Sequence, residues 1–322
     1  HCGRVRGLGL NVLETAKFLG VLAVQLVGVR HHPVVVRVDG VRQRHEVLVL
    51  GGRLHALNER AAQISTSRAA GLEHLGGVDG IIIAVPLDAV DGVMERIGPY
   101  VRSGQVVVDL SSLKCGPLES ASRHIPQALF LGVHPMFGSG AVSLAGHNVI
   151  LTPTDGTSSA LAQRIKSRIE PLGARVYTMD PSEHDELMSI VLGLPALAVA
   201  VVAKTILDSG RLAEAREVSG TSLELLMALT ESMLCQGNDL YSMLLSALPA
   251  SPRLSAGFTA SAAHFAQMCE RRDRAALHDE MAAMAQRLAE SNHTASDAYD
   301  RMYAMLEALQ RFPSKNRAPE SA

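Results

Sequence analysis

The sequence contains no tryptophan, and aromatic residues make up only 3% of its 322 residues. Charge of one sign is also lacking, since the formal net charge is −2 and no long basic run occurs. We therefore do not expect nucleic acid to be the main partner of this protein. Hydrophobic residues reach 47%, which excludes disordered and fibrous proteins, and the length suffices for two domains.

Cysteine is scarce and follows no metal-binding pattern. The four cysteines, at positions 2, 115, 235 and 269, form no C-x-x-C pair and lack histidines at zinc-site spacing. We therefore predict reduced thiols and no metal site. The succession of charged, apolar and small segments that marks a signal peptide is not found, so we expect the protein in the cytoplasm.

One apolar run, residues 187–203, carries no charge and approaches the roughly 18 to 20 residues that a membrane helix needs. Pro195 interrupts it, and Glu186 and Lys204 flank it closely. We interpret this run as a helix buried in the core of a dimer and expect no membrane contact.

The centre of the chain contains three apolar, β-branched runs, in QVVVDLSSLKCGPLES and LFLGVHPMFGSGAVSLAGHNVILTP. Such runs are typical of buried strands in a parallel sheet. The first run ends in Ser111, Ser112 and Lys114, and the second ends in His134. Because ligands of open α/β sheets bind beyond the carboxyl ends of strands, hydroxyls, an ammonium and an imidazole should converge there.

A domain boundary is expected at the sequence Asp180-Pro181-Ser182-Glu183, which has the N-cap, first-position proline and acidic N3 residue of a helix start. We predict an α/β domain over residues 1–180, with residues 1–75 irregular or degenerate. An all-helical domain should follow over residues 181–312, and residues 313–322 should be a disordered tail.

Five segments of the chain resemble the prephenate dehydrogenase family in order and spacing, over about residues 80–245. They are DLSSLK, GVHPMFG, SLAGHNVILTPTDG, LGARVYTMDPSEHDELMSIVLGL and LYSMLL. The resemblance implies a Rossmann-like dinucleotide-binding domain followed by a helical dimerisation domain. It further implies a homodimer that uses NAD, with NADP as the alternative, to decarboxylate a cyclohexadienyl dicarboxylate oxidatively. With prephenate the product is 4-hydroxyphenylpyruvate, as in tyrosine biosynthesis.

The resemblance also suggests roles for individual residues. His134 would accept a hydrogen bond from the ring hydroxyl, and an ordinary pKa near 6.5 leaves its neutral form available at pH 7. Ser112, Lys114 and His184 would bind the substrate. The resemblance also implies that Val85, Pro86 and Ser111, which follow two of the predicted strands, contact the cofactor.

The glycines that should bind the pyrophosphate are ambiguous, because no clean G-x-G-x-x-G turn occurs. One candidate is Gly7 with Gly9, followed by the helical NVLETAKFLG. An equal candidate is Gly51 with Gly52, after the strand at residues 47–50. A third interpretation makes residues 33–50 a β-hairpin that turns at Asp39-Gly40.

Two departures from the family affect the expected substrate. Ala196 lies where many members have a histidine, and Glu224 lies where many bacterial members have a carboxylate-binding arginine. A less cationic pocket would favour amino-bearing substrates, so arogenate and 4-amino-4-deoxyprephenate are alternatives to prephenate. A catalytically silent, dimeric homologue that serves as a binding module is the alternative from another class.

Overall fold

The computed structural model describes residues 33–41, 43–50, 72–77, 80–138, 141, 143–236, 238–291 and 297–311. The expectations for Gly7, Gly9, Gly51, Gly52 and the tail at 313–322 lie outside these residues and stay predictions. The chain divides into two compact units, residues 1–188 and 189–322, which are described one at a time.

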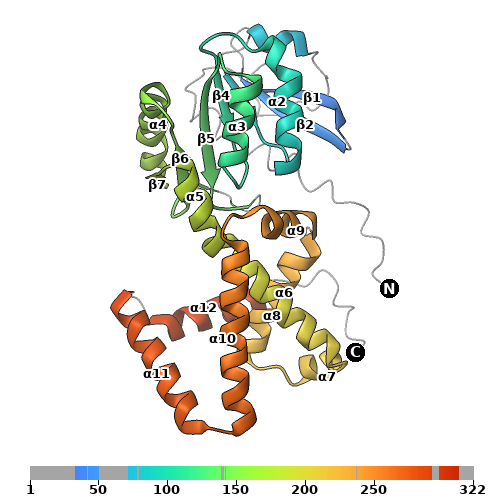
Figure 1. The fold of residues 1–322 in the computed structure, drawn as a ribbon, viewed down its shortest axis with the longest axis vertical. Coiled ribbons are helices and arrows are strands. Elements are labelled where there is room, and N and C mark those ends of the chain that lie inside the picture. The colour runs from blue at the N-terminus through green and yellow to red at the C-terminus, as the bar shows by residue number, and fades with distance from the viewer. Residues whose placement is uncertain are drawn as a thin grey trace. The chain divides into compact units, whose positions relative to one another are not determined.

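The first unit contains a seven-stranded sheet whose strands follow one another in sequence order (Figure 1). The strands are β1 (Pro33–Val41), β2 (Gln43–Leu50), β3 (Gly80–Ile83), β4 (Val106–Asp109), β5 (Leu129–Pro135), β6 (Asn148–Thr152) and β7 (Arg175–Thr178). Strands β3, β4 and β5 are parallel, as expected, and Ile82, Val108 and Leu131 lie in register across them. Helices α2 (Val90–Ile97) and α3 (Cys115–His124) connect these three strands.

The third apolar run departs from the expected parallel sheet, because β6 pairs with β5 in the antiparallel direction. A parallel pair needs a crossover, usually a helix, and no helix is described between Pro135 and Asn148. The N–H of Met136 instead donates to the carbonyl of Asn148, so the chain turns back along β5. Strand β7 then pairs parallel to β6, and the sheet is mixed.

The β-hairpin of the third interpretation is present in β1 and β2, which pair antiparallel, and β2 also pairs antiparallel with β3. Its turn differs from the expected one, because Val41 is paired with Gln43. Asp39 and Gly40 lie instead where the register shifts, between Val38 and Val41. The backbone pairing of β1 with β2 thus continues past Asp39-Gly40 to Val41 and Gln43, and the dipeptide does not form the turn.

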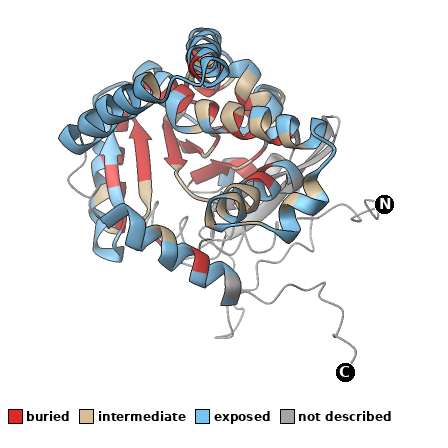
Figure 2. Cartoon of the chain, turned by 90° about the horizontal axis from the view of Figure 1, so that it is seen from below, coloured by how far each residue is buried: buried red, intermediate tan, exposed pale blue. Residues whose placement is uncertain are grey.

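Both faces of the parallel strands β3 and β4 are covered by apolar cores, because alternate residues of a strand point to opposite faces. Ile81 and Val107 pack with α2 and α3, whereas Ile82 and Val108 pack on the other face with α4 (Gly156–Ile169). Figure 2 shows buried strands flanked by helices whose outer sides are exposed. Burying each such side chain contributes about 1.5 to 3 kcal/mol. With both faces covered, the strand ends remain as the place for a site.

The division between the units falls one helix later than expected. Helix α5 (Pro181–Met188) begins as predicted, with Asp180 accepting hydrogen bonds from the N–H and hydroxyl of Ser182. The units separate only after Met188, so α5 belongs with the sheet. Within this unit the Asp185 carboxylate of α5 accepts hydrogen bonds from backbone N–H groups at the start of α3.

The described part of the second unit is entirely helical. After the π-helical turn Ser189–Gly193 it contains α6 (Leu194–Asp208), α7 (Leu212–Glu217), α8 (Thr221–Gln236), α9 (Asn238–Ala247), α10 (Ser251–Arg271), α11 (Arg274–Ser291) and α12 (Ala298–Arg311). Pro195 lies in the first turn of α6, where its missing N–H is tolerated. Ala196, Val199 and Met233 form a small core between α6 and α8.

One helical run, Pro181–Asp208, is long and apolar enough to cross a membrane by length and composition. Only 22% of its most apolar window is buried within the chain. The interpretation of this run as the core of a dimer stays a prediction.

Candidate active site

The carboxyl ends of β3, β4 and β5 meet at one edge of the sheet, where Ile83, Asp109 and Gly132 are in register. Val85 follows β3 and is buried, while the next residue, Pro86, is exposed. Ser111, which is buried, and Ser112, which is half-buried, follow β4. The β5 end carries His134, only 5% exposed. The predicted residues thus lie on three adjacent strand ends.

Lys114 is fully buried and faces Asp109. Its Nζ lies 2.5 Å from Oδ2 of Asp109 and 3.2 Å from the Asp109 carbonyl oxygen. The hydroxyl of Ser111 donates to the same Oδ2 at 2.8 Å, and its N–H donates to Oδ1. Burial lowers the pKa of Lys114, and the adjacent Asp109 carboxylate opposes that shift. The lysine predicted to meet substrate carboxylates is therefore paired within the protein.

The lysine side chain fits because β5 has glycine at position 132. A Cβ atom there would lie 2.7 Å from Cδ of Lys114 and would also clash with Oγ1 of Thr152 on β6. Thr152 is paired with Gly132 in the sheet, and its hydroxyl donates to the Gly132 carbonyl. The Asp109–Lys114 pair therefore depends on the missing side chain of Gly132.

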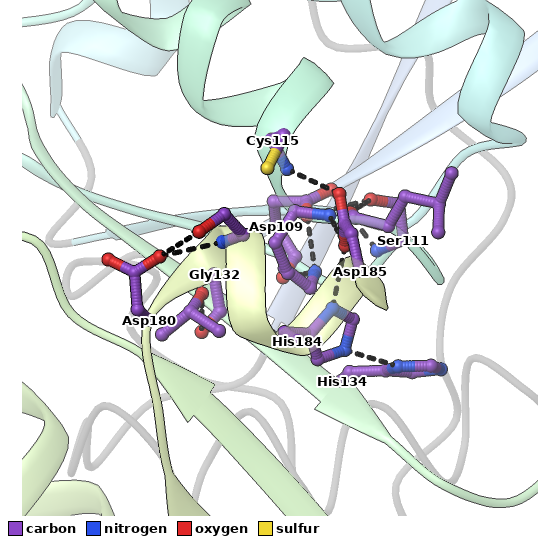
Figure 3. Close-up of polar contacts among 12 residues, drawn as sticks. Asp109, Ser111, Cys115, Gly132, His134, Asp180, His184 and Asp185 are labelled. Atoms are coloured by element: carbon purple, nitrogen blue, oxygen red, sulfur yellow. Dashed lines mark hydrogen bonds and ion pairs between the residues drawn. The ribbon is translucent and has the colours of Figure 1, made fainter. Parts of the chain in front are cut away.

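His134, His184 and Asp185 form a chain of hydrogen bonds in the first unit (Figure 3). Nδ1 of His134 lies 2.9 Å from Nε2 of His184, and Nδ1 of His184 lies 2.7 Å from Oδ1 of Asp185. All three side chains are buried, and His184 has no exposed surface. Among the described residues, His184 is the one hydrogen-bond partner of the His134 ring, so Nε2 of His134 is available to a ligand.

Asp185 also fixes the start of α3. Oδ1 accepts the N–H of Lys114 at 2.8 Å, and Oδ2 accepts the N–H of Cys115 at 2.9 Å, as Figure 3 shows for Cys115. Lys114 is the N-cap residue of α3 and makes no side-chain cap of its own, so Asp185 supplies the acceptor and the negative charge that a helix start favours. Burial raises the pKa of Asp185, but its hydrogen bonds with His184, Cys115 and Lys114 hold the pKa below its ordinary value.

The surroundings of His134 favour its neutral form. Burial lowers its pKa well below 6.5, the positive charge of Lys114 and the neighbouring His184 lower it further, and Asp185 opposes them. At neutral pH the ring is therefore uncharged. A neutral imidazole beside a bound hydroxyl can accept its hydrogen bond and its proton.

Two members of the cluster were not singled out from the sequence, namely Asp109 and Asp185. Asp109 was recognisable, since it opens the segment DLSSLK at the end of a buried strand. Asp185 carries no comparable signal, because an acidic residue near a helix start is common and its partner Lys114 is 71 residues away. Among the described residues, no group of three or more His, Cys, Asp or Glu side chains is arranged to hold a metal ion.

Comparison with known proteins gives a family match over residues 30–178, to "Prephenate dehydrogenase, nucleotide-binding domain". The chain is 26% identical over 199 residues to "Probable arogenate/prephenate dehydrogenase" of Methanocaldococcus jannaschii, covering 61% of this chain and 45% of the relative. The chain spans less than half of the length of the curated relatives that it matches.

Two solved structures share the fold. Prephenate dehydrogenase from A. aeolicus, in complex with hydroxyphenyl propionate and NAD+, has a TM-score of 0.56 at 19% identity and covers 69% of this chain and 80% of that one. Synechocystis arogenate dehydrogenase has a TM-score of 0.53 at 20% identity and covers 71% and 82%. The family match over the sheet and the names of the curated relatives agree, so residues 30–178 are similar to the nucleotide-binding domain of prephenate dehydrogenases.

Proposed function

We propose that the protein is an NAD-dependent dehydrogenase that converts prephenate to 4-hydroxyphenylpyruvate and carbon dioxide in the cytoplasm. One observation carries this proposal within the family, namely the His134 ring at the end of β5. It is buried, its pKa is lowered, and its Nδ1 is bonded to His184, so Nε2 is the atom left for a substrate hydroxyl.

The reaction requires a base at the hydroxyl of the substrate. As hydride leaves the ring carbon that bears the hydroxyl, the hydroxyl proton becomes acidic, and the ring carboxylate leaves as carbon dioxide while the ring becomes aromatic. Nε2 of His134 accepts that proton and returns it to the oxygen of the new phenol, so the overall reaction releases no proton. NAD+, when bound, supplies the hydride acceptor.

The first unit fits a nicotinamide cofactor at the ends of its parallel strands. The succession β3-α2-β4-α3-β5 is the βαβαβ arrangement whose strand ends form dinucleotide sites. Val85 and Pro86 offer apolar surface beside the serines of β4, and Asp109 balances the charge of Lys114. We therefore keep Val85, Pro86 and Ser111 as cofactor residues and NADP as the alternative cofactor.

The roles of Ser112 and Lys114 in the proposal differ from each other. Ser112 is half-buried after β4 and remains a candidate for direct contact with the substrate. Lys114 would have to leave Asp109 to bind a carboxylate, which costs the buried pair several kcal/mol. We therefore propose that Lys114 supports the site indirectly. It pairs with Asp109, and its charge lowers the pKa of His134.

Amino-bearing substrates are the second candidates, because of the residues at positions 196 and 224. Ala196 is buried in the core of the helical unit with Val199 and Met233. Glu224 accepts a hydrogen bond from the hydroxyl of Ser219 at 3.3 Å, so its carboxylate has a local partner. Neither residue provides a cation for the second carboxylate of prephenate, whereas a glutamate favours an ammonium.

Comparing kcat/KM for prephenate, arogenate and 4-amino-4-deoxyprephenate, each with NAD+ and NADP+, tests the substrate assignment. We expect prephenate with NAD+ to give the highest value. A preference of more than about a hundredfold for an amino substrate, which unpaired polar groups can produce, would overturn the choice. A silent homologue would bind neither cofactor, and a thermal-shift titration with NAD+ would then show no change.

We also propose a homodimer formed through the helical unit. Helix α11 has 18 residues and buries none of them within the described chain. It nevertheless carries Met281, Met284 and Leu288, which are exposed. A helix with unburied apolar residues gains stability when a second chain covers them, so a second copy of this chain is the expected partner.

A further inference from the structure

We propose that Asp185 and His184 are positioning residues that hold His134 in the tautomer with a free Nε2 lone pair. This inference rests on the proposed function. It gives His184 the role of orienting the base His134, and not the predicted role of binding the substrate. The observations that carry it are the two hydrogen bonds of 2.7 and 2.9 Å and the burial of all three side chains.

The ionised carboxylate gives the chain of hydrogen bonds one direction. A carboxylate only accepts, so Nδ1 of His184 must carry the hydrogen that faces Asp185. In the arrangement that we propose, Nε2 of His184 carries the lone pair and accepts from Nδ1–H of His134. His134 is left with an unprotonated Nε2. Asp185 therefore sets the tautomer of His134 through His184, and this tautomer is the one that can take a proton from a hydroxyl.

The same carboxylate links this tautomer to the backbone after β4. Oδ1 of Asp185 receives both the N–H of Lys114 and the His184 ring, while Oδ2 receives the N–H of Cys115. The backbone N–H groups supply two of the acceptor's hydrogen bonds, so they keep the carboxylate ionised inside the protein. The charged neighbours that act on the pKa of His134 are Lys114 and His184, which lower it, and Asp185, which raises it.

Nitrogen NMR of histidine-labelled, full-length protein tests the inference without substrate. The signals of His134 are those that disappear in His134→Asn. In the wild type at neutral pH we expect His134 protonated at Nδ1 alone. In His184→Met, which removes the acceptor but keeps the bulk, the hydrogen should move largely to Nε2. A wild-type His134 protonated at Nε2, or a tautomer unchanged in His184→Met, would overturn the inference.

Steady-state kinetics of matched variants give the second measurement. His184→Gln keeps an amide oxygen that can accept from His134, whereas His184→Met does not. We expect kcat to fall about 10- to 100-fold more in the methionine variant, the usual loss when the outer partner of a functional histidine is removed. KM and the melting temperature should differ little between the two. Equal losses in both variants, with lower melting temperatures, would indicate a structural role and contradict the inference.

Asp185→Asn and Asp180→Asn form a second pair, since both carboxylates lie at the start of α5. Among the contacts of the described chain, the Asp180 carboxylate binds the N–H and hydroxyl of the exposed Ser182 and makes no hydrogen bond to either histidine ring. The hydrogen bond between the N–H of His184 and the Asp180 backbone carbonyl does not involve the side chain that the substitution changes. We expect Asp185→Asn to lower kcat and shift the His134 tautomer, and Asp180→Asn to leave both unchanged. If the wild type oxidises none of the three substrates, the proposed function fails, while the NMR result still decides the positioning role.

Discussion

Individual side chains of this site are tuned by burial and by neighbours that are distant in the sequence. His134 was predictable because a histidine followed by proline must lie in extended chain, at the end of a strand. Its low pKa was not predictable, because the shift arises from burial and from Lys114 and His184, which only the folded chain brings together. Asp185 likewise gains its role from its contacts with His184 and with the backbone at the start of α3.

The lowered pKa of His134 predicts a pH dependence of stability. The unfolded chain binds a proton at about pH 6.5, and the folded chain does so only at lower pH. The stabilisation is therefore complete above about 6.5 and is lost as the pH falls through the folded pKa. Urea unfolding at about pH 7.5 and 5.5 should show a larger loss for the wild type than for His134→Asn. Equal losses would show that His134 titrates normally.

The buried pair of Lys114 and Asp109 gives a double-mutant test. Lys114→Met should destabilise the fold by about 3 to 5 kcal/mol, because it leaves the Asp109 carboxylate buried without its cation. Lys114→Met combined with Asp109→Asn should recover much of that loss in urea unfolding. A single variant of normal stability with a raised KM would instead restore the lysine as a direct contact of the substrate.

Strands and helices followed the sequence where the hydrophobic pattern was regular. The parallel strands β3, β4 and β5 and the start of α5 were predicted from β-branched runs and from a proline at the first helical position. The antiparallel direction of β6 was not predicted, because the sequence of a buried strand is the same kind of apolar run in either direction. The direction is determined by the connection that precedes the strand. The hairpin turn was misplaced because the pairing of β1 with β2 continues past Asp39-Gly40, with a shift of register, to Val41 and Gln43.

Strand β5 offers a prediction at Gly132. Gly132→Ala should destabilise the protein by about 1 to 3 kcal/mol, the usual effect of an added methyl in a close-packed site. The new Cβ would press on Thr152 and on the Lys114 side chain, which is held by Asp109. Gly138→Ala is the control, because nothing in the described structure lies within 4 Å of a Cβ there. Equal melting temperatures for both variants would contradict this packing.

The whole chain divides into a unit that carries the site and a helical unit that exposes apolar surface. We expect a mass of twice 34.3 kDa by light scattering at micromolar concentration. Leu288→Glu should shift the protein towards the monomer, because Leu288 is 61% exposed on α11. Leu172→Glu, on the first unit and 41% exposed, should leave the mass unchanged. A wild type that stays monomeric would contradict the proposed dimer.

The most direct test of the proposed function measures NADH and carbon dioxide together, as prephenate is added to the wild type and to His134→Asn with NAD+. The proposal predicts one NADH and one carbon dioxide per prephenate for the wild type. In His134→Asn, kcat should be lower by roughly 10² to 10⁴, the usual contribution of a positioned acid–base group, with the affinity for NAD+ nearly unchanged. NADH without carbon dioxide, or near-normal turnover in His134→Asn, would contradict the assignment of His134 as the base of an oxidative decarboxylation.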